Sequence, residues 1–170
     1  LWAAQSGSDG RAAVIGLDRD VVQKTVEAVA GPTELVLAND NAPGQVVISG
    51  GLAAIGRARR LLREQGAKRV IRLNVSGAFH SPHMAPVAEA LADAFDELDW
   101  RDADPPVVSN VTAEPVVDGG LIRSLLAEQV RSQVEWDASM RRLAGEGVHR
   151  VVECGTGNGL SGMRERKALR

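Results

Sequence analysis

The fold is decided by residues 34–49, which read ELVLANDNAPGQVVIS. Two short apolar segments, 34–38 and 45–49, flank the segment 39–44, which is rich in residues that favour turns. Apolar runs of this length on either side of turn formers are typical of two paired strands. The sequence therefore predicts a strand, a turn and a second strand in this stretch.

A helix and a strand are predicted on each side of this pair of strands. Upstream, an apolar run at 12–17 predicts a strand, and apolar residues at helical spacing follow between Asp18 and Gly31. Downstream, a helix is expected at 52–65 and a strand at 69–75. The order strand, helix, strand, strand, helix, strand is that of the ferredoxin-like arrangement. We therefore expect residues 12–75 to form a ferredoxin-like small subdomain, with residues 1–11 as a truncated lead-in.

Residues 76–170 have another pattern, in which helices alternate with strands. Ser81 and Pro82 suit a helix start, since serine can cap a helix and proline fits its first position. Strands are expected at 106–111 and 148–154, and short helices at 121–130 and 137–144. Such alternation favours an α/β unit with a parallel sheet, whose missing partner strands we expect upstream of Leu1.

Composition excludes several classes of protein. A net charge of −2 argues against a nucleic-acid partner, whose phosphates require a clustered basic face. No apolar run approaches the roughly 18 residues that a membrane span needs. The single cysteine, Cys154, is compatible with a reducing cytosol, so we expect a cytoplasmic protein, and by default this cysteine is buried and inert. Four arginines of the second helix are interpreted as a solvated face, with an acidic partner as the alternative: Arg57, Arg59, Arg60 and Arg63.

His80 is the most informative candidate for chemistry. It comes after a predicted strand and immediately before a predicted helix start, where a side chain can project into a cleft. The near-neutral pKa of histidine suits a general base, but packing beneath the helix is the alternative that spacing alone leaves open. His83 follows three residues later, and no acid nearby has metal-ligand spacing, so we expect no metal site.

Two further patterns bear on enzymatic function. Residues 151–159, VVECGTGNG, resemble the nucleotide loop of S-adenosylmethionine-dependent methyltransferases, in which glycines let the backbone approach the cofactor. That loop normally begins its fold, whereas here only eleven residues follow Gly159. A serine nucleophile would normally lie in Gly-x-Ser-x-Gly, and this pattern does not occur in the sequence.

Five stretches together resemble the malonyl-CoA:acyl carrier protein transacylase family and the related acyltransferase domains of polyketide synthases. The matches occur in the family's order over nearly the whole chain. They are ANDNAPGQVVISG at 38–50, VSGAFHSP at 75–82, PVVSNVT at 106–112, Gln129 with VEW at 134–136, and ECGTGNGLSG at 153–162.

The resemblance implies a ferredoxin-like small subdomain inserted in an α/β-hydrolase-like large one, of which residues 76–170 would be the C-terminal part. It implies that His80 is the base that activates a serine and that the backbone carbonyl of Gln129 orients this histidine. Asn39 and Asn41 would line the cleft, and Phe79 resembles the pattern in members that take malonyl rather than methylmalonyl units. The serine elbow, the oxyanion loop and the arginine for the malonyl carboxylate are expected upstream of Leu1.

The implied reaction moves a malonyl group from malonyl-CoA to the phosphopantetheine thiol of acyl carrier protein through a serine ester, in fatty acid or polyketide biosynthesis. No permanently bound cofactor is expected; the substrates are malonyl-CoA and phosphopantetheinylated acyl carrier protein. Without the serine, the isolated chain is expected to be inactive. A non-catalytic module that binds acyl carrier protein is the first alternative, and a methyltransferase is the remote one.

Overall fold

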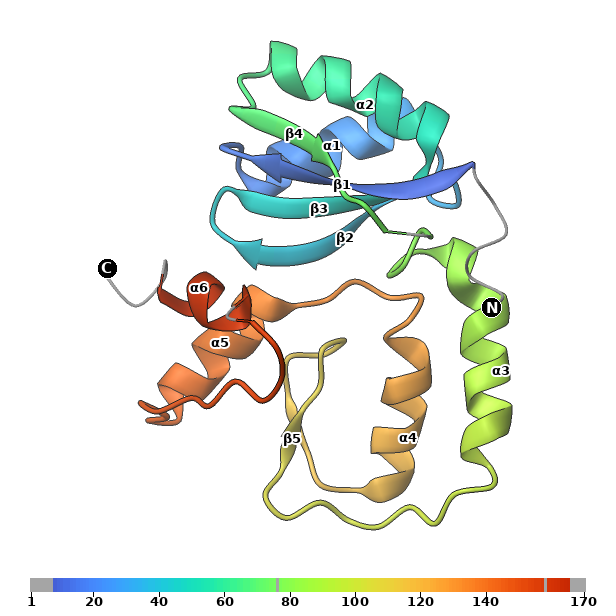
Figure 1. Ribbon diagram of the computed structural model, residues 1–170, viewed down its shortest axis with the longest axis vertical. Helices are drawn as coiled ribbons and strands as arrows, with labels where there is room; N and C mark the ends of the chain where they lie inside the picture. The colour runs from blue at the N-terminus through green and yellow to red at the C-terminus, as the bar shows by residue number, and fades with distance from the viewer. Residues whose placement is uncertain (1–7, 76, 158, 166–170) are drawn as a thin grey trace.

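A computed structural model describes residues 8–75, 77–157 and 159–165 of the 170-residue chain. Figure 1 shows a sheet with two helices in the upper half and a looser group of helices in the lower half. The upper half contains β1 (Asp9–Ile15), α1 (Arg19–Val29), β2 (Leu35–Ala42), β3 (Gln45–Gly51), α2 (Leu52–Glu64) and β4 (Arg69–Arg72). This order confirms the element order predicted for residues 12–75.

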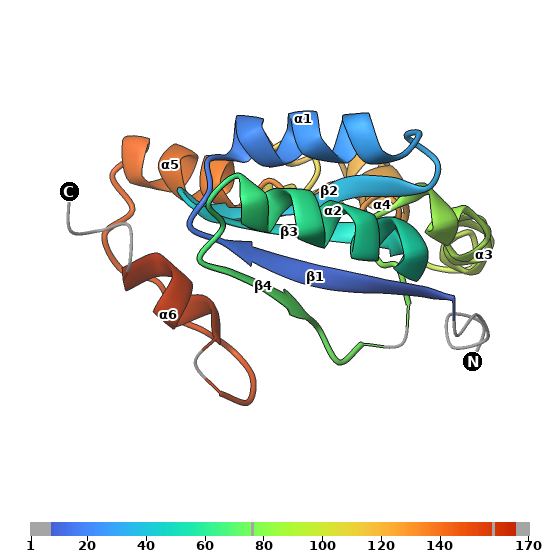
Figure 2. The ribbon, with the colours of Figure 1, turned by 90° about the horizontal axis from the view of Figure 1, so that it is seen from above.

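The four strands form one antiparallel sheet in the order β2-β3-β1-β4. The first and third strands are paired along their whole length, from Asp9 opposite Gly51 to Ile15 opposite Gln45. Figure 2 shows both helices on the same face of this sheet. The other face is therefore left for contacts outside the sheet and its helices.

The core lies between the sheet and its two helices. Alternate residues of the strands point into it because side chains along a strand alternate between the faces. The buried apolar residues of this core are Ala12, Val14, Val22, Val26, Leu35, Leu37, Val46, Ile48, Ala54, Ile55, Ala58, Leu62 and Val70. The four arginines of α2 are all exposed, which confirms the solvated face expected for them.

The lower half begins with a short 3-10 helix, Pro82–Met84, followed by α3 (Ala85–Phe95). It continues with β5 (Val107–Val108), β6 (Pro115–Val116), α4 (Gly119–Glu128), α5 (Trp136–Gly145) and α6 (Gly159–Glu165). None of the helices in the part of the chain that the structure describes is long and apolar enough to cross a membrane.

Three expectations for the strands were wrong in whole or in part. The turn expected at 39–44 is reduced to Pro43 and Gly44, because β2 continues through two irregularities to Ala42. The segment 148–154 pairs with no strand among the described residues, and its Val152 is 69% exposed. The strand expected at 106–111 pairs over two residues only, and antiparallel to β6.

A short bridge joins the two halves at the free edge of β2. Val134 pairs with Asn39 in a parallel bridge, in which Val134 donates its N–H to the Ala38 carbonyl at 2.9 Å. In the same bridge the N–H of Asp40 donates to the Val134 carbonyl at 3.0 Å. These two bonds explain why β2 extends beyond its predicted end, since its polar residues find backbone partners there.

Candidate active site

His80 lies in the connection between the sheet and α3, at the level of the bridge between the two halves. Its backbone has a φ of 62°, a conformation that is uncommon for a residue with a side chain. The backbone N–H of His80 donates to the Val130 carbonyl at 2.8 Å, which fixes this unusual conformation. Ser81, expected to cap the helix with its side chain, instead donates its hydroxyl to the Ala78 carbonyl at 2.6 Å.

The imidazole ring of His80 is oriented by the neighbouring carbonyl. Its Nδ1 lies 2.7 Å from the carbonyl oxygen of Gln129. A carbonyl oxygen can only accept, so Nδ1 carries the proton, and in the neutral ring Nε2 is left as the hydrogen-bond acceptor. The structure thus brings together His80 and Gln129, and the atom left free is the one that a general base uses.

The Gln129 carbonyl is itself held by the surrounding segment. Gln129 follows the last turn of α4, and its side-chain oxygen accepts a hydrogen bond from Asn110 at 2.9 Å. Five residues further on, Val134 pairs with the edge of the sheet. The segment 129–134 is therefore anchored at both ends, and it presents two successive carbonyl groups to His80.

Burial is the main influence on the charge of His80. It lowers the pKa of the imidazole by disfavouring the cationic form, and the nearby positive charge of Arg11 lowers it further. The hydrogen bond to the Gln129 carbonyl is the second largest influence and acts in the opposite direction, as does the backbone of Ser132. The net result is a lowered pKa, so the ring is neutral and able to accept a proton at neutral pH.

We expect an NMR titration of the folded chain to give His80 a midpoint below about 6.5, the usual value for histidine. The same resonance in urea-unfolded chain should return to about that value, because the burial and the Arg11 charge are lost on unfolding. A folded midpoint at or above the unfolded one would contradict the environment described for the ring.

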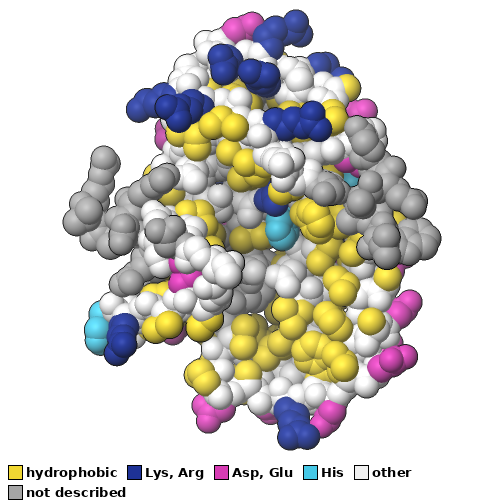
Figure 3. All heavy atoms as spheres, viewed as in Figure 1, with side chains coloured by type: hydrophobic (Ala, Val, Ile, Leu, Met, Phe, Trp, Pro, Cys, Tyr) yellow, Lys and Arg dark blue, Asp and Glu magenta, His cyan; other side chains and the backbone are white. Residues whose placement is uncertain are grey.

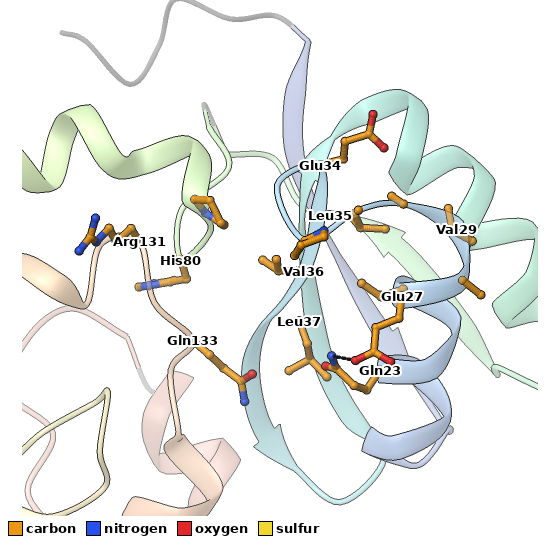
Figure 4. Close-up of a pocket in the computed structure, with 16 residues that line it drawn as sticks. Gln23, Glu27, Val29, Glu34, Leu35, Val36, Leu37, His80, Arg131 and Gln133 are labelled. Atoms are coloured by element: carbon orange, nitrogen blue, oxygen red, sulfur yellow. Dashed lines mark hydrogen bonds between the residues drawn. The ribbon is translucent and has the colours of Figure 1, made fainter.

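His80 also borders a cleft of about 840 Å³ between α1, β2 and the segment 131–133. Figure 4 shows the ring directed toward the segment that carries Arg131 and Gln133, while Val36 and Leu37 of β2 lie on the opposite side. Gln23 and Glu27 of α1 are joined by a hydrogen bond of 2.6 Å at the far wall. The residues that line this cleft do not include Asn39, Asn41 or Phe79.

Asn39 and Asn41 lie on β2, and within the part of the chain that the structure describes only the first makes a polar side-chain contact. The Asn39 side-chain oxygen accepts a hydrogen bond from the Arg11 guanidinium, which comes from β1. Asn41 and Phe79 are half-buried, and the Asn41 side chain makes no hydrogen bond within the described residues. The sequence reasoning missed Arg11 because the strand was expected to begin at residue 12.

Other candidate features do not join this site. The Glu153 carboxylate accepts hydrogen bonds from the backbone N–H groups of Leu160 and Ser161 at 3.1 and 3.0 Å, so it caps α6. Cys154 is exposed rather than buried as expected, because the segment that carries it is not covered by a sheet. His83 lies 3.0 Å from Asp9, and the described residues contain no group of three His, Cys, Asp or Glu suited to a metal ion.

Comparisons with known proteins agree on one family. The model of the acyl transferase domain matches residues 3–156. The malonyl CoA-acyl carrier protein transacylase of Bacillus subtilis is 42% identical over 162 residues, which are 95% of this chain and 51% of that protein. The transacylase of Staphylococcus aureus strain MRSA252 is 38% identical over the same share of this chain and 53% of its own length.

Solved structures agree with these sequence matches. The malonyl-CoA:acyl carrier protein transacylase of Xanthomonas oryzae has a TM-score of 0.92 at 39% identity, covering 97% of this chain and 52% of that one. A malonyl-transacylase in complex with a type II polyketide synthase acyl carrier protein has a TM-score of 0.91 at 32% identity. The match covers 97% of this chain and 53% of that one.

The mixed α/β fold with its four-stranded antiparallel sheet thus matches part of the transacylase structures. The chain spans about half the length of the curated relatives it matches. A match over most of the chain to one family model, with identities near 40%, leaves one assignment. The chain belongs to the malonyl-CoA:acyl carrier protein transacylase family of acyl transferase domains.

Proposed function

We propose that this chain is the part of a malonyl transacylase that supplies the general base. The observation that carries the proposal is the contact between His80 Nδ1 and the Gln129 carbonyl, which leaves Nε2 free to take a proton. The lowered pKa of the buried ring supports this role, because a base must be unprotonated at neutral pH.

In the proposed reaction His80 Nε2 takes the proton of a serine hydroxyl while the serine oxygen attacks the thioester carbonyl of malonyl-CoA. The bond to sulfur breaks, coenzyme A leaves as the thiol after taking the proton from His80, and a malonyl-serine ester remains. The phosphopantetheine thiol of acyl carrier protein then gives its proton to His80 and attacks this ester. The serine takes the proton back, and malonyl-acyl carrier protein is released.

The proposal also covers the two subdomains, the residues that line the substrate cleft, and the partners. The βαββαβ unit is proposed as the ferredoxin-like small subdomain, and residues 76–170 as the C-terminal part of an α/β-hydrolase-like large subdomain. Asn39 and Asn41 are proposed to line the cleft that holds the substrate, which is distinct from the cleft beside α1. Phe79, next to the base, is proposed to favour malonyl over methylmalonyl units. Acyl carrier protein and a coenzyme A thioester are the proposed partners, in fatty acid or polyketide biosynthesis, and a cytoplasmic location stays a prediction.

The test is malonyl transfer by the longer protein that carries this segment. Incubation with radiolabelled malonyl-CoA and phosphopantetheinylated acyl carrier protein should give labelled carrier protein, separated on a gel and confirmed by its mass. The 170-residue chain alone should give no labelled carrier protein, because the nucleophilic serine is expected outside it. Circular dichroism checks that this chain is folded in the assay. A folded longer protein that transfers no malonyl group would remove the proposed function.

A further inference from the structure

Arg11 lies on the face of the sheet that α1 and α2 leave uncovered. Its neighbours on β1, Ala12 and Val14, are both in the core beneath the helices. Since side chains alternate along a strand, Arg11 points to the opposite face. From there its guanidinium extends across β3, where Ser49 is its partner in the register, to bond Asn39 on β2.

The guanidinium of Arg11 is only partly satisfied. It has five N–H donors, and Asn39 is the single acceptor that the described residues provide. Its Nε is buried without a hydrogen-bond partner, as is the hydroxyl of the fully buried Ser49 opposite it. No carboxylate among the described residues forms an ion pair with Arg11 either. A half-buried positive charge without a counter-charge is costly, so this position favours an anion.

The unpaired charge is close to the proposed base. The positive charge of Arg11 acts on the His80 imidazole, and Asn39, its hydrogen-bond partner, forms the bridge that anchors the segment carrying Gln129. On the face shown in Figure 3, a histidine and a Lys or Arg side chain lie next to each other in a hollow between the two halves. An anion bound at Arg11 would therefore lie beside the atoms that react.

We propose that Arg11, held by Asn39, binds the free carboxylate of the acyl group that is being transferred. This inference rests on the proposed function. The resemblance already places one arginine for the malonyl carboxylate upstream of Leu1, and Arg11 on β1 would be a second residue that determines specificity. A guanidinium fork matches the two oxygens of a carboxylate, and such charged hydrogen bonds are stronger than neutral ones. Arg11 would favour an acyl group that ends in a carboxylate over one that ends in a methyl group.

The position of Arg11 beside His80 fits the malonyl carboxylate better than the phosphate of the same substrate. A single methylene separates the malonyl carboxylate from the thioester carbonyl, which must lie near His80 for the proposed reaction. The phosphate is at the far end of the pantetheine arm, well away from the reacting carbonyl. Because the charge of Arg11 reaches His80, the anion close to the thioester fits this position better.

The test measures binding to the 170-residue chain, which needs no nucleophile, so its outcome is independent of turnover. The probes are malonyl-pantetheine, which carries only the carboxylate, acetyl-pantetheine, which carries no charge, and phosphopantetheine, which carries only the phosphate. Binding is followed by NMR of the Arg11 Nε–H and the Asn39 side-chain amide. The variants are Arg11→Gln and, as the matched control, Arg59→Gln on the exposed face of α2.

Malonyl-pantetheine should bind at least about tenfold more tightly than acetyl-pantetheine, as one added charged pair predicts, and it should shift both resonances. Arg11→Gln should bring the two affinities within about twofold, while Arg59→Gln keeps the preference. Equal binding of the two thioesters by the unaltered chain, or a preference that survives Arg11→Gln, would overturn the proposal. A larger shift of Arg11 by phosphopantetheine would assign the site to the phosphate and overturn it as well.

Failure of this inference can be told apart from failure of the proposed function. If the longer protein transfers malonyl groups but the chain shows no preference for the carboxylate, only the role of Arg11 is lost. If no malonyl transfer occurs although the carboxylate binds at Arg11, the proposed function is lost and the anion site remains.

Discussion

If the proposed function is right, His80→Ala in the longer protein that carries this segment is expected to lower the rate of malonyl transfer roughly 10³-fold or more. The substitution removes Nε2, the only atom of the site that we propose takes the proton of the nucleophile. Loss of a general base has this order of effect because the serine hydroxyl is a weak nucleophile without it. The measurement is kcat/KM for malonyl-CoA, with the malonyl-serine ester followed by mass spectrometry.

The matched control for this substitution is His149→Ala. His149 is exposed and lies beyond α5, outside the site, so its removal should leave kcat/KM within about twofold of the parent. The circular dichroism spectrum and urea midpoint of both variants should be close to those of the parent. If His80→Ala keeps more than about a tenth of the activity, another group takes the proton and the role proposed for His80 is wrong.

Gly50→Ala should destabilise the chain by about 3 kcal/mol or more. Gly50 lies in β3 with a φ of 154°, and a Cβ there would come within 2.0 Å of the Glu34 carbonyl oxygen and 2.8 Å of Leu35 Cα. Both contacts are with backbone atoms at the start of β2 and the residue before it, so no side-chain rotation can relieve them. The sheet must therefore shift where β2 and β3 begin to pair.

Gly56→Ala is the control for Gly50→Ala. Gly56 is exposed in α2, and a Cβ there meets nothing within 4 Å. Alanine is the better helix former by about 0.5–1 kcal/mol, so this variant should be slightly more stable than the parent. Urea unfolding followed by circular dichroism gives both free energies. A Gly50→Ala chain as stable as the parent would show that the close approach of β2 to β3 is not as described.

Much of the sheet and its helices could be predicted because local patterns determine them. The apolar runs at 12–17 and 45–49 and the helical spacing after Asp18 and Leu52 each specify one element within a short window. The end of β2 could not be predicted in this way. Its polar residues 39–41 favour a turn, but backbone bonds to Val134, almost a hundred residues away, hold them in the strand.

In the candidate site, too, residues marked by a local pattern could be predicted and those that depend on distant contacts could not. His80 could be singled out because a histidine before a helix start is a local signal. Its contact with the Gln129 carbonyl could be expected only from the resemblance, since a backbone carbonyl leaves no residue-type signal in the sequence. Arg11 gave no signal, because its role depends on the position of β1 next to β3 and on Asn39 two strands away. Contacts between distant segments are what single-sequence patterns lack.

The bridge at Val134 has a consequence for the motion of the molecule. The amides of Asp40 and Val134 both depend on the segment 130–134 staying against the edge of β2. Separation of the two halves would release these two hydrogen bonds in one cooperative opening, whereas the bond from His80 to Val130 joins two residues of the segment 76–170 and need not open. Hydrogen exchange should therefore give the amides of Asp40 and Val134 one common opening free energy, which measures how firmly the two halves are held together.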